Sequence, residues 1–370
     1  MQLSYWEYKA WLSNIDFTIV GSGIVGLTCA LSLKNKYPSS KILVLEKGML
    51  PQGASTKNAG FACFGSISEI RSDIKKQSAE KVQELVKKRW DGIQLLRKNL
   101  GDTNLDFQKH GGHELFFNEH QDLYEECLSD VNLINKLLLP VFGKKAFVIK
   151  GNIFGFKNIQ ENYITHQFEG QIDTGKMMNS LLKLVQSKGI SILNGVSVQS
   201  FVENTDSVMI KTDQFELKTK NVLIATNGFA SRLINEKVKP ARAQVLITKP
   251  IKNLQIKGTF HLDEGYYYFR NIDDRILFGG ARNLDFRNEE TYEFGKTELV
   301  QNKLISILKE TILPQTRFEI DRSWSGIMGM GKEKQPIVKQ LSNHIFCGVR
   351  LGGMGIAIGS LVGDELANLL

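Results

Sequence analysis

Three glycines and one acidic residue near the N-terminus have the types and spacing of a dinucleotide-binding site. Gly21, Gly23 and Gly26 form G-x-G-x-x-G, and Glu46 follows Gly26 by 20 residues. In this motif the first glycine makes a tight turn, the second lets the backbone approach a pyrophosphate, and the third lets helix and strand pack closely. A carboxylate at the position of Glu46 accepts both ribose hydroxyls of an adenosine and repels a 2′-phosphate. The pattern predicts FAD or NAD rather than NADP.

These residues must be positioned by a strand, a helix and a second strand. Residues 17–20 are an apolar run suited to a buried strand, and residues 24–33 carry apolar side chains at helical spacing. Residues 37–40 (YPSS) break the helix, and residues 42–45 form a second apolar run that leads into Glu46. The N-terminus of the helix would present free N–H groups and a positive dipole end to the phosphates.

Composition sets the class of protein and excludes several kinds of site. The chain has 370 residues, of which 42% are hydrophobic, enough for two domains with their own cores. Its four cysteines contain no C-x-x-C pair, which argues against a disulfide framework, a zinc ribbon or a dithiol reductase site. His110 and His113 have no carboxylate or cysteine at ligand spacing, so we expect no metal.

Targeting signals are not evident. Residues 1–14 include Glu7 and Lys9 and lack an apolar core, which is unlike a signal peptide. No stretch is long and apolar enough for a membrane span. We therefore expect a soluble protein in the reducing cytoplasm that does not contact membranes. The oligomeric state is not indicated.

The net charge of +8 raises the question of an anionic partner such as nucleic acid. The lysines are scattered along the chain and form no long basic tract with interleaved aromatic residues. A mildly basic enzyme surface is the favoured interpretation, and contact with tRNA stays open as the alternative.

The rest of the chain alternates helical and strand patterns. Helices are expected at residues 78–100, ending at Gly101, at 121–139, ending at Pro140, and at 176–187. Short strands are expected at residues 190–193, 196–202, 208–212, 215–219 and 221–226, with Asn194-Gly195 as a hairpin turn. Residues 72–162 otherwise show only helical patterns.

The last third of the chain changes character twice. From residue 241 the pattern becomes that of an antiparallel sheet, with strands at 244–248, 265–270 and 275–280. Residues 344–348 then predict a strand, 350–355 a glycine-rich loop and 356–370 an apolar helix. The first and last segments therefore belong to one nucleotide-binding domain that a second domain interrupts.

Three further segments favour FAD over NAD. They are A-S-T-K-N-A-G at residues 54–60, the strands from Val196 ending in N-V-L-I-A-T-N-G, and the C-terminal G-V-R-L-G-G-M-G-I-A-I-G. With the first motif, in this order, they resemble the D-amino-acid oxidase-like family of FAD-dependent oxidoreductases, which includes glycine, sarcosine and γ-glutamylputrescine oxidases.

The resemblance implies a fold and its boundaries. The fold class would be α/β, with a Rossmann-like FAD-binding domain of the glutathione-reductase-2 type. A discontinuous α+β substrate domain with a mainly antiparallel sheet would accompany it. The FAD-binding domain would comprise residues 15–75, 165–240 and 325–370, and the substrate domain residues 76–164 and 241–324.

The resemblance also assigns cofactor-binding residues. The pyrophosphate and adenosine half would be held by Gly21, Ser22, Gly23, Ile24, Val25, Gly26, Glu46, Lys47, Val198, Ala225, Thr226 and Gly228. The ribityl chain and flavin ring would be contacted by Ser55, Thr56, Lys57, Asn58, Ala59, Gly60, Gly352, Gly353, Met354, Gly355 and Ile356. The final helix would point its N-terminus at the flavin O2, because reduction places negative charge there.

Substrate-side candidates come from the antiparallel hairpin and the glycine-rich loop. Tyr266 and Tyr268 share one strand face, and Arg282 ends the following strand. Arg282 either pairs with a substrate carboxylate or makes a structural salt bridge. Arg350 and Met354 flank the flavin loop.

Two departures from the family pattern bear on the substrate. Where D-amino-acid oxidases carry an arginine for the substrate carboxylate, this chain has Ile327 and Met328, and where glycine oxidases place another, it has Met354. A larger or less anionic amine, such as an N-alkyl amino acid or a polyamine conjugate, fits better than a simple D-amino acid. Residues 55–60 hold no cysteine or histidine, so we expect FAD to be non-covalent.

The reaction implied by the resemblance is oxidation of a C–N bond. A neutral amine would deliver hydride to flavin N5, and the imine would then hydrolyse. The alternatives are a flavoprotein acting on an aminomethyl-modified tRNA base and an FAD-binding protein without catalysis. The absence of C-x-x-C excludes a disulfide reductase, and the absence of a G-D-A-x-x-x-P-like segment disfavours an aromatic monooxygenase.

Overall fold

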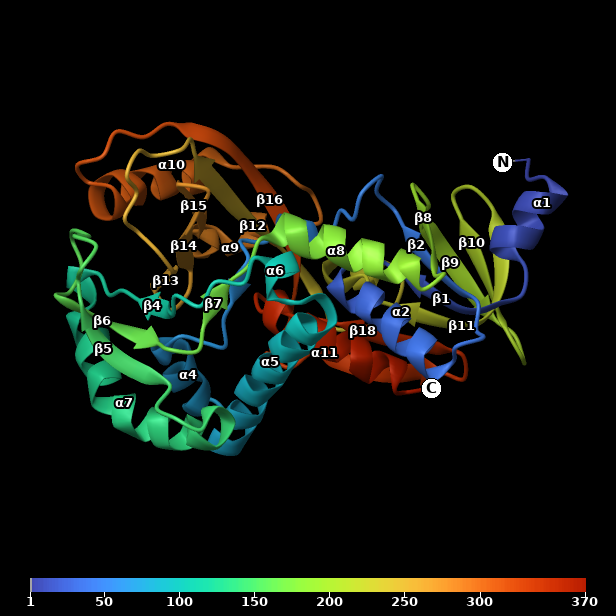
Figure 1. Ribbon diagram of the computed structural model, residues 1–370, viewed down its shortest axis with the longest axis horizontal. Coiled ribbons are helices and arrows are strands. Elements are labelled where there is room, and N and C mark those ends of the chain that lie inside the picture. The colour runs from blue at the N-terminus through green and yellow to red at the C-terminus, as the bar shows by residue number, and fades with distance from the viewer. Residues whose placement is uncertain (1) are drawn as a thin grey trace.

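The computed structural model describes residues 2–370, and within them two eight-stranded sheets occupy opposite ends of the long axis (Figure 1). The first sheet comprises β1 (Ile15–Val20), β2 (Ile42–Glu46), β8 (Ser191–Asn194), β9 (Val198–Glu203), β10 (Val208–Thr212), β11 (Glu216–Ile224), β17 (Ile337–Ser342) and β18 (Ile345–Val349). Its order is β17-β18-β11-β1-β2-β8, with β10 and β9 added beside β11. Both chain termini lie with this sheet.

The first β-α-β unit forms as its sequence predicts. Strands β1 and β2 pair in parallel, with Phe17 opposite Ile42 and Val20 opposite Leu45. The connecting helix α2 (Ile24–Lys36) starts after Gly23 and ends at Tyr37, because Pro38 disfavours a helical residue before it. Strand side chains alternate between two cores, which is why every residue of β2 is buried.

A layer of long helices covers the first sheet: α2, α5 (Ala79–Leu100), α8 (Thr174–Ser187) and α11 (Gly355–Ala367). α5 has the predicted limits, since the hydroxyl of Ser78 caps its start and Gly101 ends it. α11 packs against α2 and α5. A β-carbon at Gly363 would lie 2.5 Å from the carbonyl oxygen of Val25, so this helix pair needs a glycine at the contact.

The second sheet comprises β4 (Gly112–Glu114), β5 (Phe147–Gly151), β6 (Asn162–His166), β12 (Lys239–Thr248), β13 (Thr259–Leu262), β14 (Tyr267–Ile272), β15 (Arg275–Gly280) and β16 (Ile320–Met330). Its order is β16-β12-β15-β14-β13-β4-β6-β5, and the pairing is antiparallel except between β13 and β4. The stacked rings of Phe260 and Phe269, 4.6 Å apart, lie in its core. The prediction of a mainly antiparallel second sheet is confirmed.

The remaining elements complete the chain, and the label η marks short 3₁₀- or π-helices. They are α1 (Tyr5–Glu7), α3 (Ala54–Lys57), α4 (Ile67–Ile74), α6 (Asp102–Leu105), α7 (Gln121–Phe142), α9 (Phe286–Glu289), α10 (Glu298–Ile307), η1 (Tyr8–Leu12), η2 (Asn118–His120), η3 (Asn227–Arg232), η4 (Arg282–Leu284), η5 (Leu308–Ile312), β3 (Phe61–Ala62) and β7 (Gly170–Gln171). β3 and β7 pair with each other between the two large sheets. Among residues 2–370, no helix combines the length and apolarity that crossing a bilayer requires.

Three local predictions are wrong. Asn194-Gly195 does not close a hairpin: β8 pairs with β2 and β9 with β10, and the chain after β8 is held by the bond from the Val196 N–H to the Glu46 carbonyl. The two strands expected at 215–219 and 221–226 are the single strand β11, because no turn residue separates them. Residues 72–162 contain β4, β5 and the first residue of β6 as well as helices.

The predicted end of α7 at Pro140 is also wrong. The helix continues to Phe142 and ends at Gly143, whose φ is +72° and whose N–H bonds the carbonyl of Leu139. Phe142 is buried and stacks on Phe168 at 4.8 Å, so tertiary packing outweighs the missing proline N–H in this last turn.

Candidate functional site

A cavity of about 800 Å³ runs between the two sheets, from the start of α2 to the β14–β15 hairpin. The sequence-predicted residues that line it are Gly21, Gly23, Ile24, Val25, Glu46, Lys47, Ser55, Lys57, Asn58, Ala59, Val198, Ala225, Thr226, Gly228, Tyr266, Tyr268, Arg282, Arg350, Gly352, Gly353, Met354, Gly355 and Ile356. Ser22, Gly26, Thr56 and Gly60 lie behind its wall. The structure therefore brings most of the predicted residues to one cavity.

The glycine motif forms a tight cradle at the N-terminus of α2. Gly21 has a φ of +107°, and a β-carbon at Gly26 would lie 2.0 Å from the Gly21 carbonyl oxygen. A β-carbon at Gly23 would lie 2.8 Å from the Ser55 hydroxyl, which accepts a hydrogen bond from the N–H of Ile24. The first turn of α2 thus meets the cavity through backbone and a hydroxyl, as an anion site requires.

Glu46 holds a fixed, buried carboxylate at the end of β2. One oxygen accepts the N–H and the hydroxyl of Ser22 at 3.1 and 2.7 Å, and the other accepts the N–H of Gly48 at 2.9 Å. These bonds orient the carboxylate where it lines the cavity. Ser22, which sequence reasoning placed at the cofactor, instead supports Glu46.

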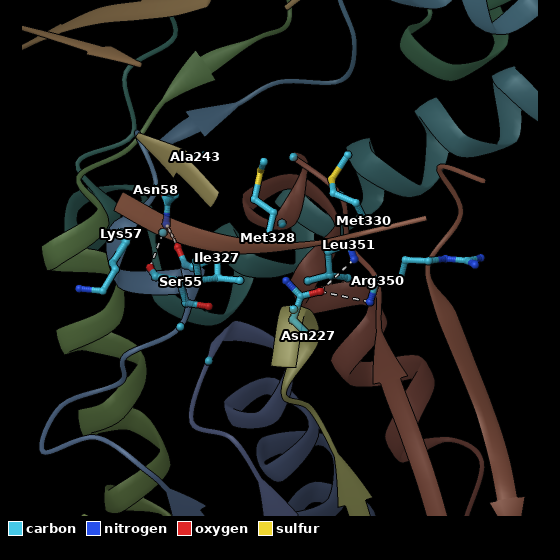
Figure 2. Close-up of a pocket in the computed structure, with 18 of the residues that line it drawn as sticks. Ser55, Lys57, Asn58, Asn227, Ala243, Ile327, Met328, Met330, Arg350 and Leu351 are labelled. Carbon is cyan, nitrogen blue, oxygen red and sulfur yellow. Dashed lines mark hydrogen bonds between the residues drawn. The ribbon is translucent and has the colours of Figure 1, made fainter. Parts of the chain in front are cut away.

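The segment from α3 to Gly60 is locked by its own side chains. Asn58, shown in Figure 2, donates to the carbonyls of Ala54 and Ser55. Its side-chain oxygen accepts the N–H of Gly60. Gly60 has a φ of +74°, and its carbonyl accepts a bond from the buried guanidinium of Arg270. The hydroxyl of Thr56 bonds the Pro51 carbonyl, 2.6 Å away, which explains why it does not reach the cavity.

A second helix N-terminus meets the cavity at α11. The loop before it is held by Asn227, whose side-chain oxygen accepts the N–H groups of Arg350 and Leu351, both at 3.1 Å (Figure 2). Met354 precedes α11 and offers no side-chain cap, so the first N–H groups of this helix stay free. Asn227 was not among the predicted site residues, although it directly follows a predicted buried strand, where site residues often lie.

The guanidinium of Arg350 is already occupied. Its Nε donates to the carbonyl of Gln335 at 3.0 Å, and one terminal nitrogen lies 3.4 Å from a carboxylate oxygen of Glu333. The side chain extends away from Asn227 (Figure 2). Its contacts are those of a residue that ties the loop before α11 to the chain before β17.

Tyr266, Tyr268 and Arg282 form the far wall of the cavity. Tyr266 and Tyr268 line it while Tyr267 is buried in the core, as strand alternation predicts. The guanidinium of Arg282 stacks on Phe286 at 4.8 Å and pairs with no carboxylate among residues 2–370. Burial lowers the pKa of Arg282, yet an arginine stays charged in proteins. This wall carries an unneutralised cation.

The comparisons with known proteins agree with this geometry. The family described as FAD dependent oxidoreductase, DAO, matches residues 16–369. The chain belongs to this family. It is 23% identical over 401 residues to the probable oxidoreductase OrdL of Haemophilus influenzae, covering 97% of this chain and 83% of that protein.

Solved structures share the fold. An L-proline dehydrogenase from P. horikoshii superposes with a TM-score of 0.75 and 18% identity, covering 96% of this chain and 93% of that one. A glycine oxidase from Geobacillus kaustophilus superposes with a TM-score of 0.74 and 18% identity, covering 96% of this chain and 94% of that one. The predicted fold class, a Rossmann-like FAD-binding domain with a second domain, is confirmed, and the chain is an oxidoreductase enzyme.

The residues present fit the FAD of this DAO-family enzyme. The cradle at Gly23 has no room for a side chain, the buried Glu46 carboxylate lies beyond it, and the cavity is long enough to reach a second free helix end at Gly355. When bound, FAD supplies a two-electron acceptor. The N-termini of α2 and α11 and the carboxylate of Glu46 are the groups of this chain that would bind FAD.

Several cavity residues of this DAO-family enzyme were not anticipated. On the substrate side they include Phe61, Cys63, Glu69 and His261. The Cys63 thiol donates to the Met354 sulfur at 3.4 Å. On the opposite side, β16 contributes Met330, which was not anticipated either, beside Ile327 and Met328, whose positions the family resemblance had implied. All three side chains are apolar (Figure 2). No spacing in the sequence links these residues, because strand pairing between distant segments brings them together.

Proposed function

We propose that this chain oxidises the C–N bond of an amine that carries a carboxylate, with an N-alkyl amino acid as the preferred class. The observation that carries the proposal is Arg282, a half-buried guanidinium on the cavity wall without a carboxylate partner among residues 2–370. A substrate carboxylate would neutralise it through two parallel hydrogen bonds. Tyr266 and Tyr268, on the same wall, would close around the substrate.

The opposite side supports a substituted amine. Ile327 and Met328 present apolar surface in place of a second arginine, so one carboxylate is recognised and the remaining surface favours alkyl groups. Two structural neighbours, a glycine oxidase and an L-proline dehydrogenase, are named for amino acids, and proline is a secondary amine. These names support the substrate class without defining the substrate.

The chain's own contribution is positioning. Arg282 would fix the carboxylate, the aromatic wall of Phe61 and Tyr268 would exclude water, and the free N-terminus of α11 would favour negative charge that develops near it. FAD, held non-covalently, would take the hydride from the carbon next to the amine nitrogen. The imine product would then hydrolyse in water.

Anaerobic mixing with a panel of amines tests this proposal. The panel contains glycine, N-methylglycine, L-proline, D-alanine, iminodiacetate and putrescine, and loss of the flavin absorbance band is followed. Bleaching by a carboxylate-bearing secondary amine, faster than by glycine or putrescine, is the expected result. Bleaching by putrescine alone, or by no panel member, contradicts the proposal.

A further inference from the structure

A buried histidine lies on the substrate side of the cavity, and the proposed function does not use it. His261, in β13, is the one histidine among the described cavity-lining residues and is 6% exposed. Its ring meets Phe61 edge to face at 5.3 Å, and Phe61 meets Tyr268 in the same way at 5.6 Å. His261 therefore belongs to the wall that faces the substrate.

A buried carboxyl group stands behind this histidine. The His261 Nε2 has no hydrogen-bond partner and lies 4.0 Å from Glu169 Oε2. Glu169 is 1% exposed, and its other oxygen accepts the N–H groups of Phe64 and Gly65 at 2.7 and 3.3 Å. These two bonds fix the carboxyl group with one oxygen toward the imidazole.

We propose that His261 accepts the proton of the substrate ammonium, and that Glu169 is a positioning residue that stabilises the resulting imidazolium. The inference rests on the proposed function, because an ammonium has no lone pair with which to expel a hydride. In this step the N–H bond of the substrate breaks and its electron pair stays on the amine nitrogen. The imidazole lone pair forms the new N–H bond, and no electrons are transferred.

Other groups on this wall do not suit the role: the carboxylate of Glu69 already accepts the N–H of Ser66 and lies 4.0 Å from the ammonium of Lys334. Burial raises the pKa of Tyr268 to about 12 and that of the Cys63 thiol well above its usual range, so both keep their protons. Arg282 is a permanent cation. Burial lowers the pKa of His261, which leaves a neutral imidazole with a free lone pair at neutral pH.

Neighbouring elements set the charge around His261. Burial keeps His113 in β4 and His166 in β6 neutral, each with a pKa of about 3. Glu114, opposite His261 in the β13–β4 register, is bonded by the N–H of Ser68, and burial raises its pKa to about 7. The carboxylate of Glu69 in α4 favours the imidazolium.

The ionisation of Glu169 should determine how kcat/KM for amines depends on pH. Burial raises the pKa of Glu169 to about 8, although the hydrogen bonds from the N–H groups of Phe64 and Gly65 lower it. The charge of Glu69 adds a smaller increase and that of Arg89 in α5 a smaller decrease. Above that pH the pair is an imidazole beside a carboxylate and can take up one proton. Below it Glu169 already holds a proton, and a second would create an uncompensated buried cation. The kcat/KM for amines should therefore rise through about pH 8.

Kinetics on the holoenzyme test the inference. We would measure kcat/KM for each panel amine that bleaches the flavin, between about pH 6 and pH 10. His261→Asn should lower kcat/KM roughly a hundredfold, while His110→Asn, an exposed histidine outside the cavity, should not. Glu169→Gln should abolish the rise near pH 8. Glu69→Gln should keep the cap of α4 and the rise in kcat/KM. The rise should move to lower pH, because the charge of Glu69 raises the pKa of Glu169.

A second measurement does not depend on turnover. In holoenzyme labelled with ¹⁵N-histidine, the ring signals of His261, assigned by their loss in His261→Asn, should report an ionisation near pH 8 that Glu169→Gln removes. If Glu169→Gln does not fold, the test is whether the rise in kcat/KM and the ionisation seen by His261 occur at lower pH in Glu69→Gln than in the wild type. Bleaching with an unchanged pH profile in these variants overturns this inference alone. A panel in which nothing bleaches overturns the proposed function as well.

Discussion

At the scale of residues, the site depends on charges that the fold fixes before any ligand arrives. The Glu46 carboxylate is held by four hydrogen bonds, and the guanidinium of Arg282 is placed on the cavity wall without an acidic partner among the described residues. Preorganised groups of this kind bind ligands at small entropic cost. The two residues serve opposite ends of one cavity, so their variants should have separable effects.

Replacing Arg282 with alanine should lower kcat/KM for the substrate and leave FAD binding unchanged. The loss of one charge-assisted interaction of about 1.5–3 kcal/mol predicts a kcat/KM roughly tenfold to hundredfold lower, with FAD content unchanged. Steady-state kinetics with the best amine of the panel measure this. Arg287→Ala, an exposed arginine five residues on, is the matched control. An unchanged kcat/KM in Arg282→Ala would remove the carboxylate role.

Glu46→Ala should instead weaken FAD binding. Removal of the carboxylate deletes the expected ribose contacts and leaves the N–H of Ser22 without its acceptor. We expect the Kd for FAD to rise tenfold or more. Titration of apoprotein with FAD, followed by quenching of flavin fluorescence, gives the value. Glu216→Ala, an exposed residue of the same sheet, should match the wild type, and equal affinity in Glu46→Ala would contradict the assignment.

At the scale of elements, two helix N-termini converge on the cavity and each is prepared by a specific turn. α2 follows a glycine turn between β1 and its first residue, and α11 follows a loop that Asn227 holds by two hydrogen bonds. Asn227 itself has a φ of +42°, which asparagine and aspartate tolerate better than other side chains. The orientation of α11 therefore depends on a residue distant in sequence.

Asn227→Ala should loosen this loop. Two backbone N–H groups lose their acceptor, which should cost about 1–3 kcal/mol of unfolding free energy, and FAD binding should weaken with it. Thermal unfolding and FAD titration measure both effects. Asn227→Asp keeps the acceptor and the backbone conformation, so it should stay close to the wild type. Equal losses in the two variants would show that the hydrogen bonds are not responsible.

At the scale of the whole molecule, local patterns predicted more than distant pairings did. The first β-α-β unit, α5 and the β14–β15 hairpin follow from spacing and turn residues within short windows. The strands β4, β5 and β6 were not predicted because they are short and are stabilised by pairing in the order β13-β4-β6-β5, which joins segments distant in the sequence. His261 and Glu169 meet through those pairings, so no sequence spacing could have revealed them.

The division into domains also belongs to this scale. The two sheets draw their strands from alternating stretches of chain, and the strands β6, β12 and β16 run across the boundaries predicted between residues 164 and 165, 240 and 241, and 324 and 325. The division into two discontinuous domains stays a prediction. The cavity lies between the sheets and is lined by strands from both. A cofactor bound there would contact both parts of the molecule.

Non-covalent binding of FAD makes a prediction for the entire protein. Acid precipitation should release all flavin to the supernatant, since the cavity-lining Cys63 has a thiol whose pKa is raised by burial and is engaged with Met354. Removal of FAD should also lower Tm, because only the folded state binds it. Absorbance of the supernatant and a thermal scan of apoprotein measure these outcomes. Yellow colour retained on the precipitate would contradict the non-covalent proposal.

The most direct test of the central claim is product analysis after a single anaerobic turnover. Holoenzyme is mixed with N-methylglycine or L-proline, whichever bleaches the flavin faster, and quenched when bleaching is complete. We expect one oxidised product for each flavin reduced: the carbonyl compound formed by hydrolysis of the imine from N-methylglycine, or the cyclic imine and its ring-opened carbonyl form from L-proline. Reduced flavin with neither the imine nor its carbonyl hydrolysis product would contradict oxidation of a C–N bond.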